Sequence, residues 1–262
     1  MSKNKVLKEN LHLHEEEAES YENEQPEIYN PREQKRINSV LEKGRRNINT
    51  DSSEIKALDL GCGTGNILDK MIPLFDKVVG IDLSERMLSV ALSKHFSEKK
   101  KVELVRGRAS KLPFPEKYFD FVSLYSVLHH FPNLLEPISE ASRVLKGGGV
   151  LYIDHEPVQR GNLLVKLYIK FCDLLNGKRD EGLPPYEEDG KFGQGLCDYH
   201  IHHGEDGGVP TDQIREICEE NEFETIEEKR YLIYGSKAKN PLYPILKPFI
   251  NSEWQYIGQK KI

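Results

Sequence analysis

The sequence predicts an α/β fold centred on a mostly parallel, doubly wound sheet. One observation is that short apolar runs alternate with segments of helical character between residues 55 and 154. A second is the stretch IKALDLGCGTG, residues 55–65, which passes directly from an apolar strand to a loop of alternating glycines. Because strands covered on both faces are expected to be almost continuously apolar, helices should lie on both sides of this sheet.

The expected elements follow one another in chain order. Asn30-Pro31 predicts a helix start, since asparagine caps helices and proline suits their first turn. The core elements are strands at 55–60, 77–82, 101–106, 119–124 and 149–154, and helices at 66–74, 84–97 and 133–146. Gly147, Gly148 and Gly149 are expected to end the last of these helices. A helix at 211–221 and strand residues within 225–235 complete the pattern.

The chain divides into four parts. They are an acidic segment and helix at 1–50, a core at 51–157, an insertion at 158–208, and a closing helix, strands and tail of the same domain at 209–262. The insertion contains an apolar helix at 162–175, which we expect to form a lid because it leaves from the end of the fifth strand. Packing of this helix on the sheet or in a dimer contact is the alternative. The tail, with Trp254 and Tyr256, is suited to packing on the surface or across the boundary of a homodimer.

Bulk properties exclude several classes of protein. The 262 residues carry a net charge of −6, and the only compact basic run is 99–101, which argues against broad nucleic-acid binding. Four cysteines without a C-x-x-C pair suit a reducing compartment. No stretch has the length and apolarity of a membrane span or a targeting core, so we expect a cytoplasmic protein.

The glycine loop and a downstream aspartate together predict a nucleoside site. Gly61, Gly63 and Gly65 allow the backbone to approach a ligand closely. Asp82 ends the next strand, about 20 residues after the loop, where a carboxylate is placed to bind ribose hydroxyls. Asn66 occupies the position where a dinucleotide fingerprint requires a glycine, which disfavours a nicotinamide oxidoreductase. An ordinary strand-to-helix turn would leave Asp82 without a role.

Four segments carry a family resemblance: ALDLGCGTG, VVGIDLSERML, LPFPEKYFDFVSLYSVLHHF and ISEASRVLKGGGVLYIDHEP. Their order and spacing over residues 55–157 resemble the class I S-adenosylmethionine-dependent methyltransferases, in particular the small-molecule branch that includes the ubiquinone and menaquinone C-methyltransferases. The resemblance implies a seven-stranded Rossmann-like sheet that ends in an antiparallel hairpin, with S-adenosylmethionine as cofactor. Residues 1–50 and 158–262 match this family only loosely.

The resemblance also implies roles for individual residues. Asp59 and the Gly61 backbone would serve the methionine end of the cofactor, Asp82 the ribose, and Leu83 and Met87 the adenine. The complete set of expected cofactor-binding residues is Asp59, Gly61, Gly63, Gly65, Asp82, Leu83, Met87, Ala109, Ser110 and Tyr125.

Arg108 departs from the family pattern. Relatives usually carry an aspartate at this position, whose carboxylate receives the adenine amino group, and a guanidinium cannot accept a hydrogen bond. We expect Ala109 and Ser110 to meet the adenine through backbone and hydroxyl, while Arg108 points to solvent.

Methyl transfer is driven by the cofactor, so the protein mainly aligns the acceptor in a dry site. A general base is needed only if the acceptor must lose a proton. The candidate catalytic residues are His129, His130 and His155, and the candidate substrate-binding residues are Tyr29, Glu156, His200, His202 and His203. Structural packing is the alternative for Tyr29 and for one of the two adjacent histidines. The spacing of the histidines at 200–203 matches no metal motif, so we expect no metal.

These observations favour a methyltransferase that acts on a small molecule. An apolar acceptor would suit an apolar lid, because closing such a lid over a polar molecule would leave polar groups unpaired. A protein or RNA methyltransferase and a catalytically silent S-adenosylmethionine-binding protein are the alternatives.

Overall fold

The computed structural model describes residues 8, 11–12, 14–94, 101–158, 208–231 and 253–262. The predicted lid, with its helix at 162–175 and His200, His202 and His203, lies outside the described residues, as does most of the tail before residue 253. The two ends of the insertion are described: Val158 forms a parallel β-bridge with Val209, and the Val209 N–H donates to the Pro157 carbonyl at 2.6 Å. The lid itself stays a prediction.

The described residues form one seven-stranded sheet with the order β3-β2-β1-β4-β5-β7-β6. The strands are β1 (Lys56–Leu60), β2 (Lys77–Asp82), β3 (Val102–Arg106), β4 (Phe119–Tyr125), β5 (Leu145–Pro157), β6 (Phe223–Tyr231) and β7 (Glu253–Lys260). Neighbouring strands from β3 to β5 are parallel, whereas β7 is antiparallel to both β5 and β6. The predicted sheet with a closing hairpin is therefore confirmed.

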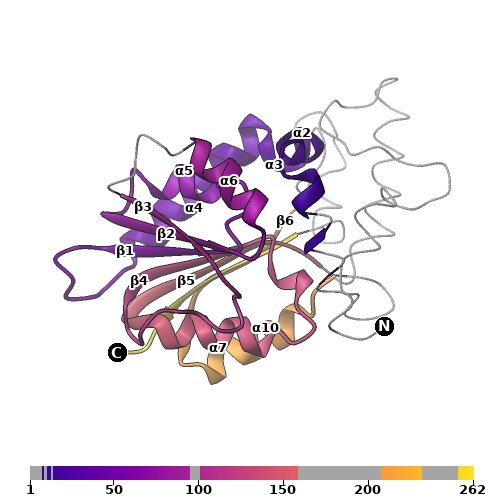
Figure 1. Cartoon of the computed structure of the whole chain (residues 1–262). Helices are drawn as coiled ribbons and strands as arrows, with labels where there is room; N and C mark the ends of the chain where they lie inside the picture. The colour runs from indigo at the N-terminus through magenta and orange to yellow at the C-terminus, as the bar shows by residue number, and fades with distance from the viewer. Residues whose placement is uncertain (1–7, 9–10, 13, 95–100, 159–207, 232–252) are drawn as a thin grey trace.

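Helices cover both faces of the sheet (Figure 1). One face carries α4 (Pro31–Arg46), α5 (Asn66–Met71) and α6 (Glu85–Lys94), with the short α2 (Tyr21–Glu24) and α3 (Pro26–Tyr29) nearby; the other carries α7 (Leu135–Val144) and α10 (Thr211–Glu220). Each face has its own buried apolar cluster, and side chains within one strand divide between the two clusters. This is the doubly wound arrangement that the alternating pattern predicts.

The helix start at Asn30-Pro31 is confirmed. The Asn30 side chain accepts a hydrogen bond from the Glu33 N–H at 3.0 Å, and Pro31 occupies the first helical position. Ile37 and Leu41 lie on one face of α4 and are fully buried. The cap and the apolar face thus place α4 over the sheet, where its polar residues reach the ends of β5 and β6.

Three predictions about the second half of the chain are wrong. The helix expected at 133–146 ends at Val144, because Leu145 is already extended (φ −77°, ψ 140°) and begins β5. The glycines at 147–149 are therefore part of a strand and do not stop a helix. Trp254 and Tyr256 also do not lie on the surface, since β7 is an inner strand in which both rings are fully buried.

Gly148 is a position where only glycine fits. Its φ is +79°, and a Cβ atom there would come 1.9 Å from the carbonyl oxygen of Asn49. Gly148→Ala should therefore lower the free energy of unfolding by more than about 2 kcal/mol, because steric overlap adds to the strain of a left-handed residue. Thermal and denaturant unfolding would measure this loss.

Gly63→Ala is the matched control. Gly63 also has a positive φ, +50°, but a Cβ there would meet nothing within 4 Å. The Gly63→Ala variant should lose no more unfolding free energy than the roughly 1–2 kcal/mol that backbone strain alone costs. Equal losses for the two variants would show that overlap with Asn49 is not the reason for glycine at 148.

Candidate functional site

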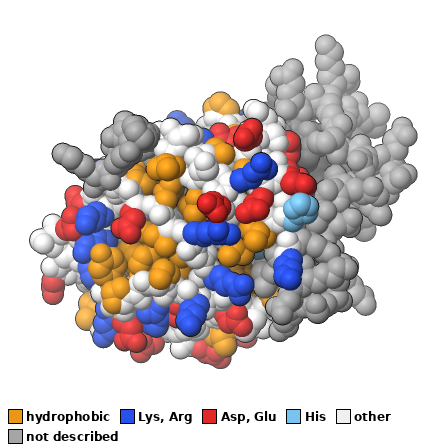
Figure 2. Space-filling model, in the orientation of Figure 1, with side chains coloured by type: hydrophobic (Ala, Val, Ile, Leu, Met, Phe, Trp, Pro, Cys, Tyr) orange, Lys and Arg blue, Asp and Glu red, His pale blue; other side chains and the backbone are white. Residues whose placement is uncertain are grey.

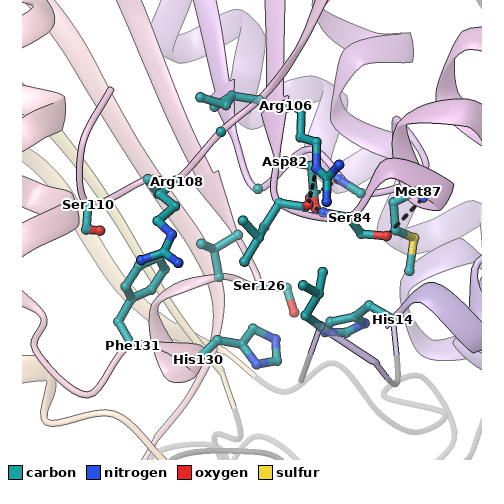
Figure 3. Close-up of a pocket in the computed structure, with 18 of the residues that line it drawn as sticks. His14, Asp82, Ser84, Met87, Arg106, Arg108, Ser110, Ser126, His130 and Phe131 are labelled. Atoms are coloured by element: carbon teal, nitrogen blue, oxygen red, sulfur yellow. Dashed lines mark hydrogen bonds between the residues drawn. The ribbon is translucent and has the colours of Figure 1, made fainter. Parts of the chain in front are cut away.

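A cavity of about 700 Å³ lies at the carboxyl ends of β1, β2 and β4 (Figure 3). This is the edge where open α/β sheets bind their ligands, and the volume lies within the range of small-molecule sites. The predicted cofactor-binding residues that line it are Gly61, Gly63, Asp82, Leu83, Met87, Ala109 and Ser110. Asp59, Gly65 and Tyr125 do not line this cavity.

Asp82 fixes the glycine loop to the end of β2. One carboxylate oxygen accepts the Gly63 N–H at 2.9 Å, and the other accepts the Ser84 N–H at 2.8 Å (Figure 3). Burial raises the pKa of Asp82, although these backbone hydrogen bonds act to lower it. Because a carboxylate has about four acceptor positions, Asp82 can still receive further donors from the cavity.

The three glycines have different tasks. A Cβ at Gly61 would come 2.6 Å from a methyl group of Val127, so glycine is needed there for packing. Gly63 faces open space, since no atom lies within 4 Å of its ideal Cβ position. Gly65 has φ +93° and precedes α5 as its N-terminal cap, which explains why it does not line the cavity.

Asp59 is a buried carboxylate with one oxygen unsatisfied. It lies in β1, only 1% exposed, and accepts a hydrogen bond from the Ser123 hydroxyl at 2.5 Å. Its other oxygen has no hydrogen-bond partner in the part of the chain that the structure describes. Burial raises the pKa of Asp59 to about 7.

Glu156 has a structural place, contrary to the prediction that it contacts substrate. It is fully buried, and one oxygen accepts the N–H groups of Val127 and Leu128, both at 2.8 Å. The other oxygen accepts the His129 N–H at 3.1 Å and lies 2.9 Å from His129 Nδ1. Burial raises the pKa of Glu156 to about 7, against the opposing effect of these hydrogen bonds. Glu156 and His129 therefore hold the turn after β4 in place.

His130 is the one of the adjacent pair that reaches the cavity. It lies at the end of the short 3₁₀ helix η2 (Leu128–His130) and lines the cavity wall. Its ring makes an edge contact with the ring of His14, with a centroid distance of 5.2 Å. Figure 3 shows both imidazoles along the lower edge of the cavity, below Asp82 and Ser84. His14 was not predicted, because nothing in its local sequence indicates that the N-terminal segment folds over this edge.

His155 lies on a distortion of β5. Its φ is +57°, and the pairing of β5 with β7 shifts register between Ile153 and Glu156. The imidazole is buried, 5.2 Å from the Tyr125 ring, and its Nε2 atom has no hydrogen-bond partner among the described residues. Burial lowers the pKa of His155, so the ring is neutral near pH 7. Strained backbone and an unsatisfied polar atom are features that often accompany functional residues.

A polar network supports His155 from α4 and β6. Arg36 donates to Glu33 and lies 2.8 Å from a carboxylate oxygen of Asp154. Asp154 also accepts the Tyr231 hydroxyl at 2.7 Å and the His155 N–H at 2.7 Å. Burial alone would lower the pKa of Arg36, but Asp154 and Glu33 raise it, so the guanidinium stays charged. Through these contacts the ends of three elements are joined around one buried ion pair.

Two tyrosines that were predicted to contact ligands instead make contacts with other residues of this chain. Tyr125 is buried, with its hydroxyl 3.4 Å from Glu33. Tyr29 lies 3.2 Å, oxygen to oxygen, from the Thr64 hydroxyl and so anchors the N-terminal segment to the glycine loop. Ser126, one residue after Tyr125, lines the cavity with φ +57° and donates its N–H to the Asp154 carbonyl at 2.9 Å.

Three further features of the described residues concern surface charge, membrane spans and metal ligands. On the face in Figure 2, basic and acidic side chains are interspersed. Within the described ranges, no helix is long and apolar enough to cross a membrane. In those same ranges, no group of three or more histidines, cysteines and acids is arranged to hold a metal ion.

The chain resembles known proteins over its core. Residues 58–153 match the family model described as a methyltransferase domain. A demethylmenaquinone methyltransferase from Staphylococcus aureus is 38% identical over 130 residues, which cover 47% of this chain and 54% of that protein. The chain thus spans about half the length of the curated relatives it matches.

Solved structures share the fold. Phosphoethanolamine N-methyltransferase 2 from Haemonchus contortus, in complex with S-adenosyl-L-methionine, has a TM-score of 0.59 at 19% identity, covering 87% of this chain and 53% of that one. The YcgJ protein from Bacillus subtilis has a TM-score of 0.54 at 17% identity, covering 87% and 99%. Residues 58–153 thus match a methyltransferase domain, and the seven-stranded sheet that contains them has the fold of S-adenosylmethionine-dependent methyltransferases.

Proposed function

We propose that this protein transfers the methyl group of S-adenosylmethionine to a small, largely apolar, quinone-like acceptor. The observation that carries the proposal is the Asp82 carboxylate, which lies beside the Gly63 backbone on the wall of one cavity. The acceptor class is supported by the relative from Staphylococcus aureus, whose name describes methylation of demethylmenaquinone.

The residues around the cavity fit this cofactor. Asp82 can accept hydrogen bonds from two ribose hydroxyls, and Gly63 leaves room for a ligand where any other residue would place a Cβ. Asp59 does not line the cavity, but it lies in β1 just before the loop and has a carboxylate oxygen without a partner among the described residues. When bound, S-adenosylmethionine supplies an electrophilic methyl group.

The residues of this chain would then align the acceptor and hold its proton. His155 is our candidate base, because a neutral imidazole with an unsatisfied Nε2 atom has a lone pair available. The Ser126 N–H donates to the carbonyl of Asp154, the residue before His155, which connects this end of β5 to the cavity wall. Asp154, Arg36 and Tyr231 would act as positioning residues by fixing the backbone on which His155 lies.

The direct test supplies the purified protein with methyl-labelled S-adenosylmethionine and either reduced demethylmenaquinone or a metabolite extract, with products followed by mass spectrometry. We expect label in a small apolar product. His155→Gln should lower kcat by at least about tenfold and flatten its pH profile, since a general base typically contributes 10²–10⁴-fold. S-adenosylhomocysteine affinity should not change.

His12→Gln is the control, because His12 is an exposed histidine on the N-terminal segment. Label appearing only in protein or RNA, or in nothing at all, would contradict the proposed acceptor. A His155 variant with normal kcat would remove this residue from the mechanism without affecting the acceptor assignment.

Asp82→Asn is expected to weaken S-adenosylhomocysteine binding by at least about tenfold, since hydrogen bonds to a charged group contribute about 1.5–3 kcal/mol each. Isothermal titration calorimetry measures the affinity, and asparagine keeps one acceptor oxygen for the loop. Glu103→Gln, an exposed acid on β3, controls for the lost charge. Equal affinities for wild type and Asp82→Asn would rule out the ribose contact.

Asp59→Asn should make the unliganded protein more stable as pH rises, relative to wild type. The folded-state pKa of Asp59 is about 7, above its ordinary value of 3.8, so the folded protein binds more protons and loses stability between these limits as pH increases. Asparagine cannot ionise and avoids this loss, which amounts to a few kcal/mol at about 1.4 kcal/mol per pKa unit.

The measurement is the difference in melting temperature between variant and wild type at pH 5 and at pH 8. We expect the melting temperature of the variant, relative to that of wild type, to be higher at pH 8 than at pH 5. Because Glu156 is present in both proteins, its titration cancels in this comparison. A difference that does not change with pH would mean that Asp59 does not titrate in this range.

A further inference from the structure

The part of the cavity next to β3 presents hydrogen-bond donors. Arg108 lines the cavity, and its side chain makes no hydrogen bond or ion pair with any other described residue. Arg106, by contrast, is 2.8 Å from Glu85 and 3.3 Å from the Leu83 carbonyl oxygen. Figure 3 shows the Arg108 guanidinium on the cavity wall beside the Phe131 ring, across the cavity from Met87. Arg108 was expected to point to solvent, but it forms part of the cavity wall.

The backbone places this arginine on the nucleobase side of the ribose contact. Asp82 and Arg106 are paired in the parallel register of β2 and β3, and the Gly107 N–H donates to the Asp82 carbonyl at 2.9 Å. The loop that holds Arg108, Ala109 and Ser110 consequently begins beside Asp82. A base attached to a ribose at Asp82 would extend towards this loop.

A guanidinium can only donate hydrogen bonds. It cannot receive the 6-amino group of adenine, although it can donate to the ring nitrogens. A 6-oxopurine instead offers an O6 and N7 pair of acceptors, which is the edge that arginine binds with two hydrogen bonds in guanine recognition. We propose that Arg108 is a specificity-determining residue, through which this cavity binds a 6-oxopurine nucleoside at least as well as the corresponding adenine nucleoside.

Two other side chains could compete for the same edge of the base. Ser110 both donates and accepts, so it tolerates either base. Among the described residues that line the cavity, Glu136 is the one carboxylate besides Asp82, and one of its oxygens accepts the Asn133 side-chain N–H at 3.0 Å. If Glu136 received the 6-amino group, adenine would be preferred whatever residue stood at 108. The experiment must therefore vary both positions.

The test compares the affinities of S-adenosyl-L-homocysteine and S-inosyl-L-homocysteine, measured by isothermal titration calorimetry on the full chain. The two ligands differ only at the purine 6-position and the adjacent N1. Wild type should bind the inosyl ligand with an affinity within about threefold of, or tighter than, the adenosyl ligand. Arg108→Asp, which introduces an acceptor, should bind the adenosyl ligand at least about tenfold more tightly than the inosyl ligand.

Glu136→Gln is the matched control and should leave the wild-type ratio unchanged. The inference rests on the cofactor site, and the outcomes separate the two. If wild type binds neither ligand, the cofactor assignment falls and the inference falls with it. If wild type binds the adenosyl ligand at least about tenfold more tightly, or if Arg108→Asp leaves the ratio unaltered, only the role of Arg108 is overturned.

Discussion

The hydrogen bonds that Asp82 accepts from Gly63 and Ser84 are the constraint on which the cavity depends. A loop of residues with positive φ has many accessible conformations, and glycine loses more freedom on ordering than any other residue. The carboxylate selects one of these conformations and fixes it to the end of β2. Because the same side chain also faces the cavity, the group that would bind the ribose is the group that shapes its surroundings.

At the end of β5, a buried carboxylate again accepts backbone N–H groups, but here it supports a turn. Glu156 is surrounded by backbone N–H groups of the turn after β4, which satisfy a charge that would otherwise be costly to bury. This turn also positions Val127 and His130 on the cavity wall. Asp154 is satisfied by Arg36, Tyr231 and the His155 backbone, so the neighbouring acids of this strand end both stabilise structure. At this strand end, the His155 Nε2 atom has no hydrogen-bond partner among the described residues.

The two groups of residues therefore differ in their chemistry. On the cavity wall, Asp82 can accept hydrogen bonds and Arg108 can donate them. Around β5, a permanently charged Arg36 and a neutral His155 lie in a region shielded from water, where electrostatic interactions are strong. The backbone hydrogen bond from Ser126 to Asp154 joins the cavity wall to this end of β5.

The alternating strands and helices, the cap at Asn30, the glycine loop and the carboxylate of Asp82 could be predicted from the sequence, because each depends on residues close together in the chain. Which strand-end acid faces the cavity depends on long-range contacts. Glu156 and Asp82 look alike in sequence, but Glu156 supports a turn and Asp82 forms part of the cavity wall. The inner position of β7 and the place of His14 could not be predicted for the same reason. Both depend on partners far away in the sequence, and a local pattern contains no information about such partners.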